Sequence, residues 1–93
     1  MSAYPVIAHM LRTAFNADDG LPEEVAVRLY LRAAKGSGQW DALVGELEHA
    51  FADATLSWKR MLLNDDYEVV DAATEEEAKT YARRILWTPV FGD

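Results

Sequence analysis

The sequence contains no cysteine. This absence rules out disulfide bonds, thiolate nucleophiles and cysteine-based zinc sites. Small secreted domains usually depend on disulfides for their stability, so a cysteine-free chain of 93 residues favours a reducing compartment. We therefore expect a cytoplasmic protein.

A long apolar run is also missing. Near the N-terminus His9 and Arg12 interrupt the apolar residues, and no basic segment precedes them. A secretory signal peptide or a membrane-spanning helix would need an unbroken apolar stretch there. We expect neither, and no association with a membrane.

Basic residues are scarce: 9 lysines and arginines stand against 16 aspartates and glutamates, a formal net charge of −7. A surface of this sign repels nucleic acid and anionic membranes, whereas it attracts a basic protein. Acidity also serves solubility alone. The charge therefore indicates a protein partner rather than direct binding of nucleic acid.

Hydrophobic residues make up 51% of the chain and aromatic residues 11%. That content is enough for a core, because large rings contribute much of the buried area in small proteins. At this length one domain, residues 1–93, is the expected organisation.

Apolar residues recur at helical spacing in four segments, and helix start and stop signals flank them. We predict helices over 4–15, from Pro22 to about Lys35, over 39–53, and from Thr74 to the Thr88-Pro89 pair. Thr74 and Glu77 form the capping-box pattern that starts the last one. Gly45, inside the third helix, suggests the close approach of a neighbouring backbone.

The stretch 55–63 suits a short helix or a strand. The absence of β-branched residues after Thr55 favours the helix. Residues 67–72 have a strand-like composition and would pair with 56–63 or a terminus, or be merely extended. The predicted fold is mainly α: a compact bundle of four to five short helices with at most a short β element near 56–72.

Sites for catalysis or cofactors are not indicated. The only histidines are His9 and His49, and Glu46 with His49 supplies one half of a carboxylate di-iron motif whose second half is missing. No serine lies in a nucleophile elbow, and no glycine-rich phosphate loop is present. We expect no metal, no cofactor and no enzymatic activity.

The segment 64–77 is the most distinctive feature, with seven acidic residues and no basic one. Tyr67 lies among the acids and Trp58 lies just upstream. Charges that speed encounter, combined with a ring that supplies affinity, are typical of a surface that captures a basic partner. Half of the acids also suit a turn or a first helical turn, where they are simply solvated. The predicted partner-binding residues are Trp58, Asp65, Asp66, Tyr67, Glu68, Asp71, Glu75 and Glu76.

The stretch Ser57–Val90, SWKRMLLNDDYEVVDAATEEEAKTYARRILWTPV, resembles immunity proteins of bacterial contact-dependent growth inhibition systems. The elements that carry the resemblance are Trp58 with Leu62-Leu63, then Tyr67-x-Val69, then EEEAKTYARRILW. The resemblance implies a cytoplasmic protein that binds and neutralises the toxin domain of a cognate effector. Many such toxins are basic nucleases, which fits an acidic inhibitor.

A different hypothesis is a small helical adaptor or regulatory subunit that acts through a homodimer or hetero-oligomer interface. In the second helix the predicted buried stripe is Val25, Ala26, Leu29, Tyr30 and Ala33. Val27, Leu31 and Ala34 lie off that stripe and would leave apolar residues on a second face.

Overall fold

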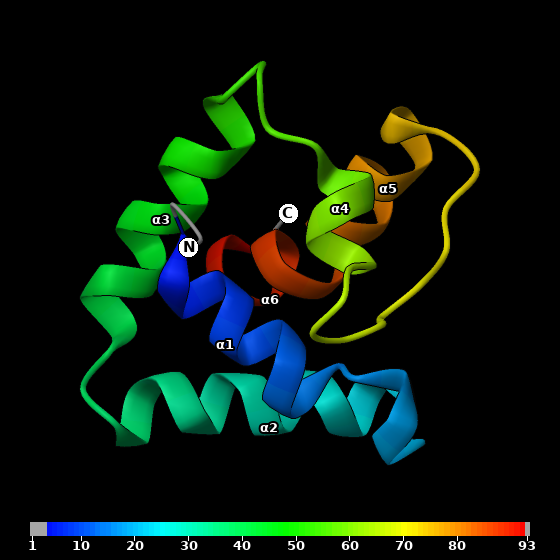
Figure 1. Ribbon diagram of the computed structural model, residues 1–93. Helices are drawn as coiled ribbons and strands as arrows, with labels where there is room; N and C mark the ends of the chain where they lie inside the picture. The colour runs from blue at the N-terminus through cyan, green and yellow to red at the C-terminus, as the bar shows by residue number, and fades with distance from the viewer. Residues whose placement is uncertain (1–3, 93) are drawn as a thin grey trace.

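The computed structural model describes residues 4–92 and confirms a mainly α fold (Figure 1). The helices are α1 (Pro5–Ala14), α2 (Glu23–Gly36), α3 (Trp40–Ala52), α4 (Trp58–Leu62) and α5 (Glu75–Ala82), with a single 3-10 turn at Ala17–Asp19. A π-helical segment, Arg83–Trp87, continues α5 directly into α6 (Thr88–Phe91). No helix within residues 4–92 has both the length and the apolar character needed to cross a membrane.

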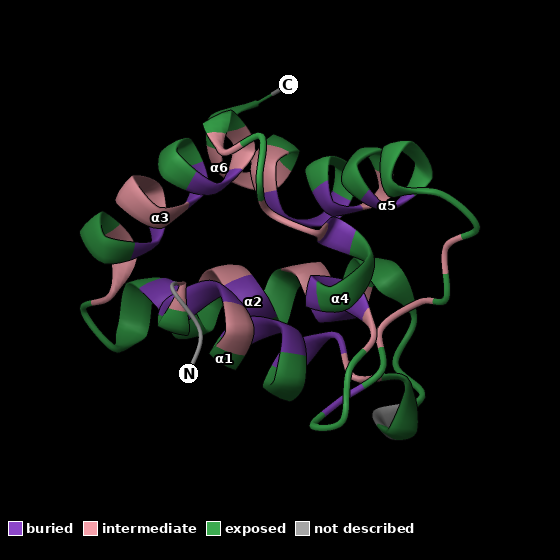
Figure 2. Ribbon diagram, turned by 45° about the horizontal axis from the view of Figure 1, so that its top comes forward, coloured by how far each residue is buried: buried purple, intermediate pink, exposed green. Residues whose placement is uncertain are grey.

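The helices enclose one core. In Figure 1, α1 crosses in front of α2, α3 rises at one side, and α4 and α5 lie together at the other. Figure 2 shows the buried residues on the inward sides of the helices. The largest fully buried side chains come from α1, α2, α3, α4 and the C-terminal helical run: Ile7, Met10, Leu11, Tyr30, Leu43, Leu47, Leu62, Ile85 and Leu86.

Helix α1 begins at Pro5, with no cap from the Tyr4 side chain. The carboxylate of Glu46 on α3 takes that role instead, accepting the backbone N–H groups of Val6 and Ile7 at 3.0 to 3.1 Å. A negative charge at the positive end of a helix is favourable, so this contact joins α1 to α3.

The buried face of α2 differs in part from the predicted stripe. Ala26 and Tyr30 are buried as expected, but Ala34 is buried too, and Leu29 is 41% exposed. Val27 and Leu31 pack against the core. The expectation that the second apolar face lies at Val27, Leu31 and Ala34 is therefore wrong.

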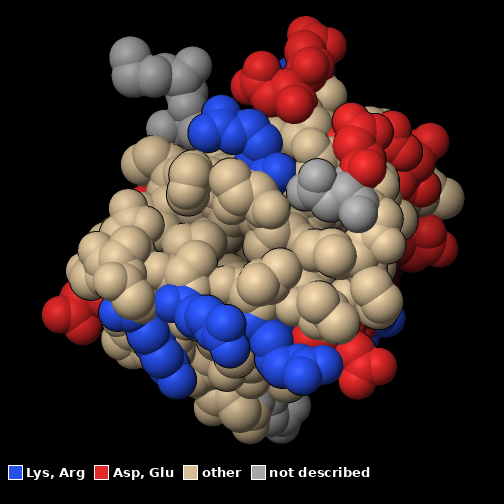
Figure 3. Space-filling model, turned by 90° about the horizontal axis from the view of Figure 1, so that it is seen from below, with Lys and Arg blue, Asp and Glu red and all other residues tan. Residues whose placement is uncertain are grey.

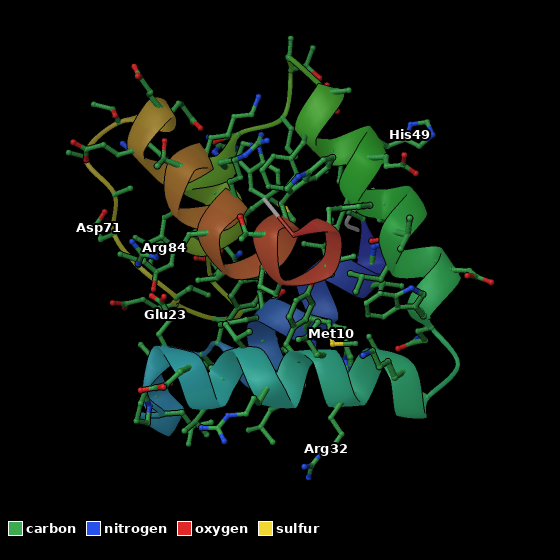
Figure 4. The ribbon with its side chains drawn as sticks, turned by 180° about the vertical axis from the view of Figure 1, so that it is seen from behind. Met10, Glu23, Arg32, His49, Asp71 and Arg84 are labelled. Atoms are coloured by element: carbon green, nitrogen blue, oxygen red, sulfur yellow. The ribbon has the colours of Figure 1, made fainter. Side chains whose placement is uncertain are left out.

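Two contacts with the C-terminal helix fix the rotation of α2. The Tyr30 hydroxyl donates to the Leu86 carbonyl at 2.9 Å inside the core. Glu23 and Arg84 form a bidentate pair at 2.7 and 3.1 Å near the surface (Figure 4). Both lie on the side of α2 that carries Ala26, and they turn Leu29 outward.

In α3, Gly45 has no close neighbour: a Cβ placed there would meet nothing within 4 Å. The predicted close approach of a backbone is wrong. Glycine at position 45 is therefore not required by packing, and it lowers the stability of α3 because glycine is a poor helix former.

Of the two alternatives for 55–63, the helix is correct. The Ser57 hydroxyl accepts the Arg60 N–H and so caps α4. Residues 67–72 form no strand, and the only β contact within residues 4–92 is an isolated antiparallel bridge between Leu63 and Glu68.

Helix α5 starts as predicted, with the Thr74 side chain accepting the Glu77 N–H at 3.1 Å. The predicted end at Thr88-Pro89 is wrong. The Thr88 N–H reaches back five residues to the Arg83 carbonyl, and Pro89 falls in the first turn of α6, where a missing N–H costs nothing.

Candidate functional site

The acidic turn 64–67 is built around the side chain of Asn64. Its Oδ1 accepts the backbone N–H groups of Asp66 and Tyr67 at 2.9 and 3.3 Å, and its Nδ2 donates to the Arg60 carbonyl at 2.8 Å. Asparagine suits this position because its short amide can replace backbone partners in a turn. The turn is thereby fixed to the end of α4.

A second set of backbone bonds holds the residues that follow. The Val69 N–H donates to the Leu62 carbonyl at 2.7 Å, and the Ala17 N–H donates to the Glu68 carbonyl at 2.6 Å. Residues 68 and 69 are thus tied both to α4 and to the turn after α1. The carboxylates of this segment project from a backbone that already has a defined shape.

Five carboxylates of the segment are exposed and have no hydrogen-bond or salt-bridge partner among residues 4–92. Figure 3 shows acidic side chains gathered along one side of the face viewed, and Figure 4 shows Asp71 pointing away from the helices. We call this set the carboxylate rim: Asp65, Asp66, Glu68, Asp71 and Glu76.

Glu75, also predicted as a binding residue, is engaged within the chain. Its carboxylate accepts the Ser57 hydroxyl at 2.5 Å and the Lys59 N–H at 3.2 Å. The Ser57 hydrogen bond is the main reason that the pKa of Glu75 lies below its usual value. Glu75 therefore joins the start of α5 to the start of α4 and is not part of the rim.

The two predicted aromatic anchors lie inside the protein. Trp58 is 3% exposed and packs on Phe51 with 4.5 Å between ring centroids. Tyr67 is 8% exposed, and its burial raises the pKa of its hydroxyl. Both rings are therefore largely covered, although Tyr67 still lines the groove beside the acidic turn.

Beside the acidic turn lies an open groove of about 480 Å³. Leu56 and Met61 give it an apolar lining, and Asp53 and Asp66 bring two carboxylates to it; Arg60 also lines it. The Asp53 carboxylate accepts the Thr55 hydroxyl and N–H and the Tyr4 hydroxyl. The bond from the Thr55 hydroxyl is the largest cause of its lowered pKa.

Sequence reasoning missed this groove because its walls come from distant parts of the chain. Tyr4 and Asp53 are 49 residues apart. Only the acids at Asp65 and Asp66 give a local signal, and they mark one edge of the groove.

For metal binding, no group of three or more potential ligands occurs in the part of the chain that the structure describes. His49 projects outward from α3 (Figure 4), and Glu46 is occupied in capping α1. What this region offers chemically is exposed negative charge next to a partly apolar recess.

In comparisons with known proteins, no family model, no curated protein and no solved structure matches the chain.

Proposed function

We propose that the chain is an immunity protein that binds and neutralises a basic toxin domain, of the kind used in bacterial contact-dependent growth inhibition. The observation that carries the proposal is the carboxylate rim. It presents five exposed acidic side chains without hydrogen-bond or salt-bridge partners in residues 4–92. The backbone that carries Asp65, Asp66 and Glu68 is held by Asn64 and by bonds to Leu62 and Ala17.

The charge of the rim favours this kind of partner. Clustered carboxylates steer a basic protein toward the correct face and raise the association rate. Because the turn is already fixed, binding does not require a flexible loop to be ordered, which would reduce affinity. Trp58 and Tyr67 are largely buried, so the carboxylates rather than these two rings would make the first contact with the partner.

The rim also suggests how inhibition would work. A nuclease recognises the phosphate backbone of its substrate with lysine and arginine side chains. Carboxylates at Asp65, Asp66 and Glu68 would occupy those side chains, and the groove beside Asp66 would receive one side chain of the toxin. Bound in this way, the protein would exclude the nucleic acid from the toxin.

The test is affinity capture from a lysate of the source bacterium with three baits. These are the unaltered protein, the charge-reversed variant D65K/D66K, and a control variant, D41K/E48K, with the same change in net charge on α3. Asp41 and Glu48 are exposed and lie outside the rim.

The proposal predicts that a basic C-terminal fragment of a very large surface protein is captured by the unaltered and control baits. It also predicts that D65K/D66K loses most of that capture. Equal capture by all three baits would show that the rim is not the binding surface. Recovery of a metabolic or regulatory complex instead would favour the adaptor hypothesis.

A further inference from the structure

The outward face of α2 combines charge and exposed apolar area in two parallel rows. Arg28, Arg32 and Lys35 follow one another at intervals of four and three residues, which places them along one side of the helix. All three are exposed, and none forms a salt bridge within residues 4–92. In a chain of net charge −7, this row is a local patch of the opposite sign.

Apolar residues run beside the basic row. Leu29 is 41% exposed, one of three large hydrophobic side chains that are exposed among the described residues. Val25, four residues before it on α2, is half-buried, and Ala33, four residues after it, is exposed. Figure 3, which views the molecule from the side of α2, shows a broad uncharged surface with lysine and arginine along one edge. Figure 4 shows Arg32 pointing away from the bundle.

We propose that this face of α2 is a docking surface for an acidic amphipathic helix of another protein. A helix that carries apolar and acidic residues at spacings of three and four presents two rows in the same arrangement. Its apolar row would cover Val25, Leu29 and Ala33, and its carboxylates would reach Arg28, Arg32 and Lys35. The surface is distinct from the carboxylate rim and does not depend on the toxin-binding role.

A second copy of the chain fits this face less well. A two-fold antiparallel contact through the apolar row would place the basic rows of both copies side by side, where like charges repel. A two-fold parallel contact would set each basic row against the uncharged flank of the other helix. Neither arrangement gives the basic residues an acidic partner.

Nucleic acid also fits less well. Three basic residues provide few phosphate contacts, and the row beside them consists of aliphatic side chains. Single-stranded nucleic acid needs aromatic rings on which bases stack, and Val25, Leu29 and Ala33 offer none. An apolar row with a charged edge is typical of helix recognition between proteins.

The experiment uses the full chain, labelled with nitrogen-15, and a synthetic 18-residue helical peptide with leucine and glutamate at the two spacings. Two further peptides serve as probes: one with lysine in place of glutamate, and one with the same composition in scrambled order. The protein variants are R28Q/R32Q and L29S, with K79Q/R83Q as a control that removes two exposed basic residues elsewhere. Amide chemical shifts report both the site of binding and the integrity of the fold.

We expect the glutamate peptide to shift amides along α2, and binding to weaken about tenfold in R28Q/R32Q and in L29S but not in K79Q/R83Q. Several results would overturn the proposal: no shifts, shifts outside α2, or equal shifts with the lysine or scrambled peptide. Shifts of α2 that appear with protein concentration alone would mean self-association. The same shifts with duplex RNA but not with the glutamate peptide would assign the face to nucleic acid.

Discussion

Two groups of side chains in the region 58–77 differ in their exposure to solvent. The rings of Trp58 and Tyr67 are buried, whereas the five carboxylates of the rim are exposed. The sequence mixes the two kinds within a few residues, but the fold separates them into an inner and an outer layer. The inner layer is expected to determine whether the region folds, and the outer layer what it binds.

Because the two layers are separate, substitutions in one should have different effects from substitutions in the other. Changes in the inner layer should alter the free energy of unfolding and leave the association rate of the folded protein unchanged. Changes in the rim should do the reverse, since exposed charges contribute little to stability.

The largest effect is expected for Trp58→Ala. Removing a buried tryptophan that packs on Phe51 leaves a cavity, which should lower the free energy of unfolding by about 3–5 kcal/mol. The Trp58 indole N–H is buried without a hydrogen-bond partner among the described residues, so Trp58→Phe should cost much less. Urea denaturation of the three proteins measures both. Equal decreases in the free energy of unfolding for Trp58→Ala and Trp58→Phe would contradict the expectation that phenylalanine is the milder substitution.

Tyr30→Phe should have the next largest effect. The substitution removes the hydroxyl that satisfies the buried Leu86 carbonyl, and an unsatisfied buried acceptor costs about 1–3 kcal/mol. Thermal unfolding followed by circular dichroism would detect the loss. A variant as stable as the unaltered protein would mean that the contact between α2 and the C-terminal helix does not depend on this bond.

Gly45→Ala should stabilise the protein by up to about 1 kcal/mol, because alanine is the better helix former and the added methyl group meets no neighbour. Gly45 lies outside the acidic region, so this variant tests whether stability and binding are independent. Denaturant unfolding should show the gain, with no change in association rate. A loss of stability would indicate a clash at Gly45.

Glu75 is exposed like the rim carboxylates, but its hydrogen bonds to Ser57 and Lys59 give it a structural role like that of the inner layer. Its pKa is lowered on folding, mainly by the Ser57 hydroxyl, from a usual value of 4.5. The folded state therefore holds its proton less tightly than the unfolded state. The stability this gives is present above pH 4.5 and is lost as the pH falls through the lower folded pKa.

Glu75→Gln should remove that part of the pH dependence. The variant should be slightly less stable than the unaltered protein at neutral pH, and the difference should shrink on acidification below pH 4.5. Unfolding in urea at several pH values measures it. A difference that is constant with pH would show that the carboxylate charge is not what holds the start of α4.

Much of the fold could be predicted from local signals. Thr74 and Glu77 mark the start of α5, and Pro22 with the glycines at 36 and 38 brackets α2 to within a residue or two. These signals work because they act on neighbouring backbone groups.

The parts that could not be predicted depend on distant contacts. Helix α2 has two rows of comparable apolar character: Val25, Leu29 and Ala33, and Ala26, Tyr30 and Ala34. The second row is buried because Tyr30 bonds to Leu86 and Glu23 pairs with Arg84, each more than 50 residues away. The helix continues past Pro89 because residues Arg83–Trp87 adopt a π-helical conformation, and no local sequence signal predicts that conformation.

The candidate site also has features that local sequence predicts and features that depend on distant contacts. The carboxylates at Asp65 and Asp66 could be found because charge clusters are visible in the sequence. The burial of Trp58 and Tyr67 could not, because an aromatic residue suits a core and an interface equally well. The groove that Tyr4 and Asp53 help to form had no local signal at all.

Capture of the partner by the carboxylate rim is tested most directly by the association rate between this protein and the captured toxin domain, measured by stopped-flow at low and at physiological salt. We predict that D65K/D66K associates at least about tenfold more slowly than D41K/E48K at low salt, and that added salt narrows the gap. Equal rates for the two variants at both salt concentrations would contradict the claim that the carboxylate rim captures the partner.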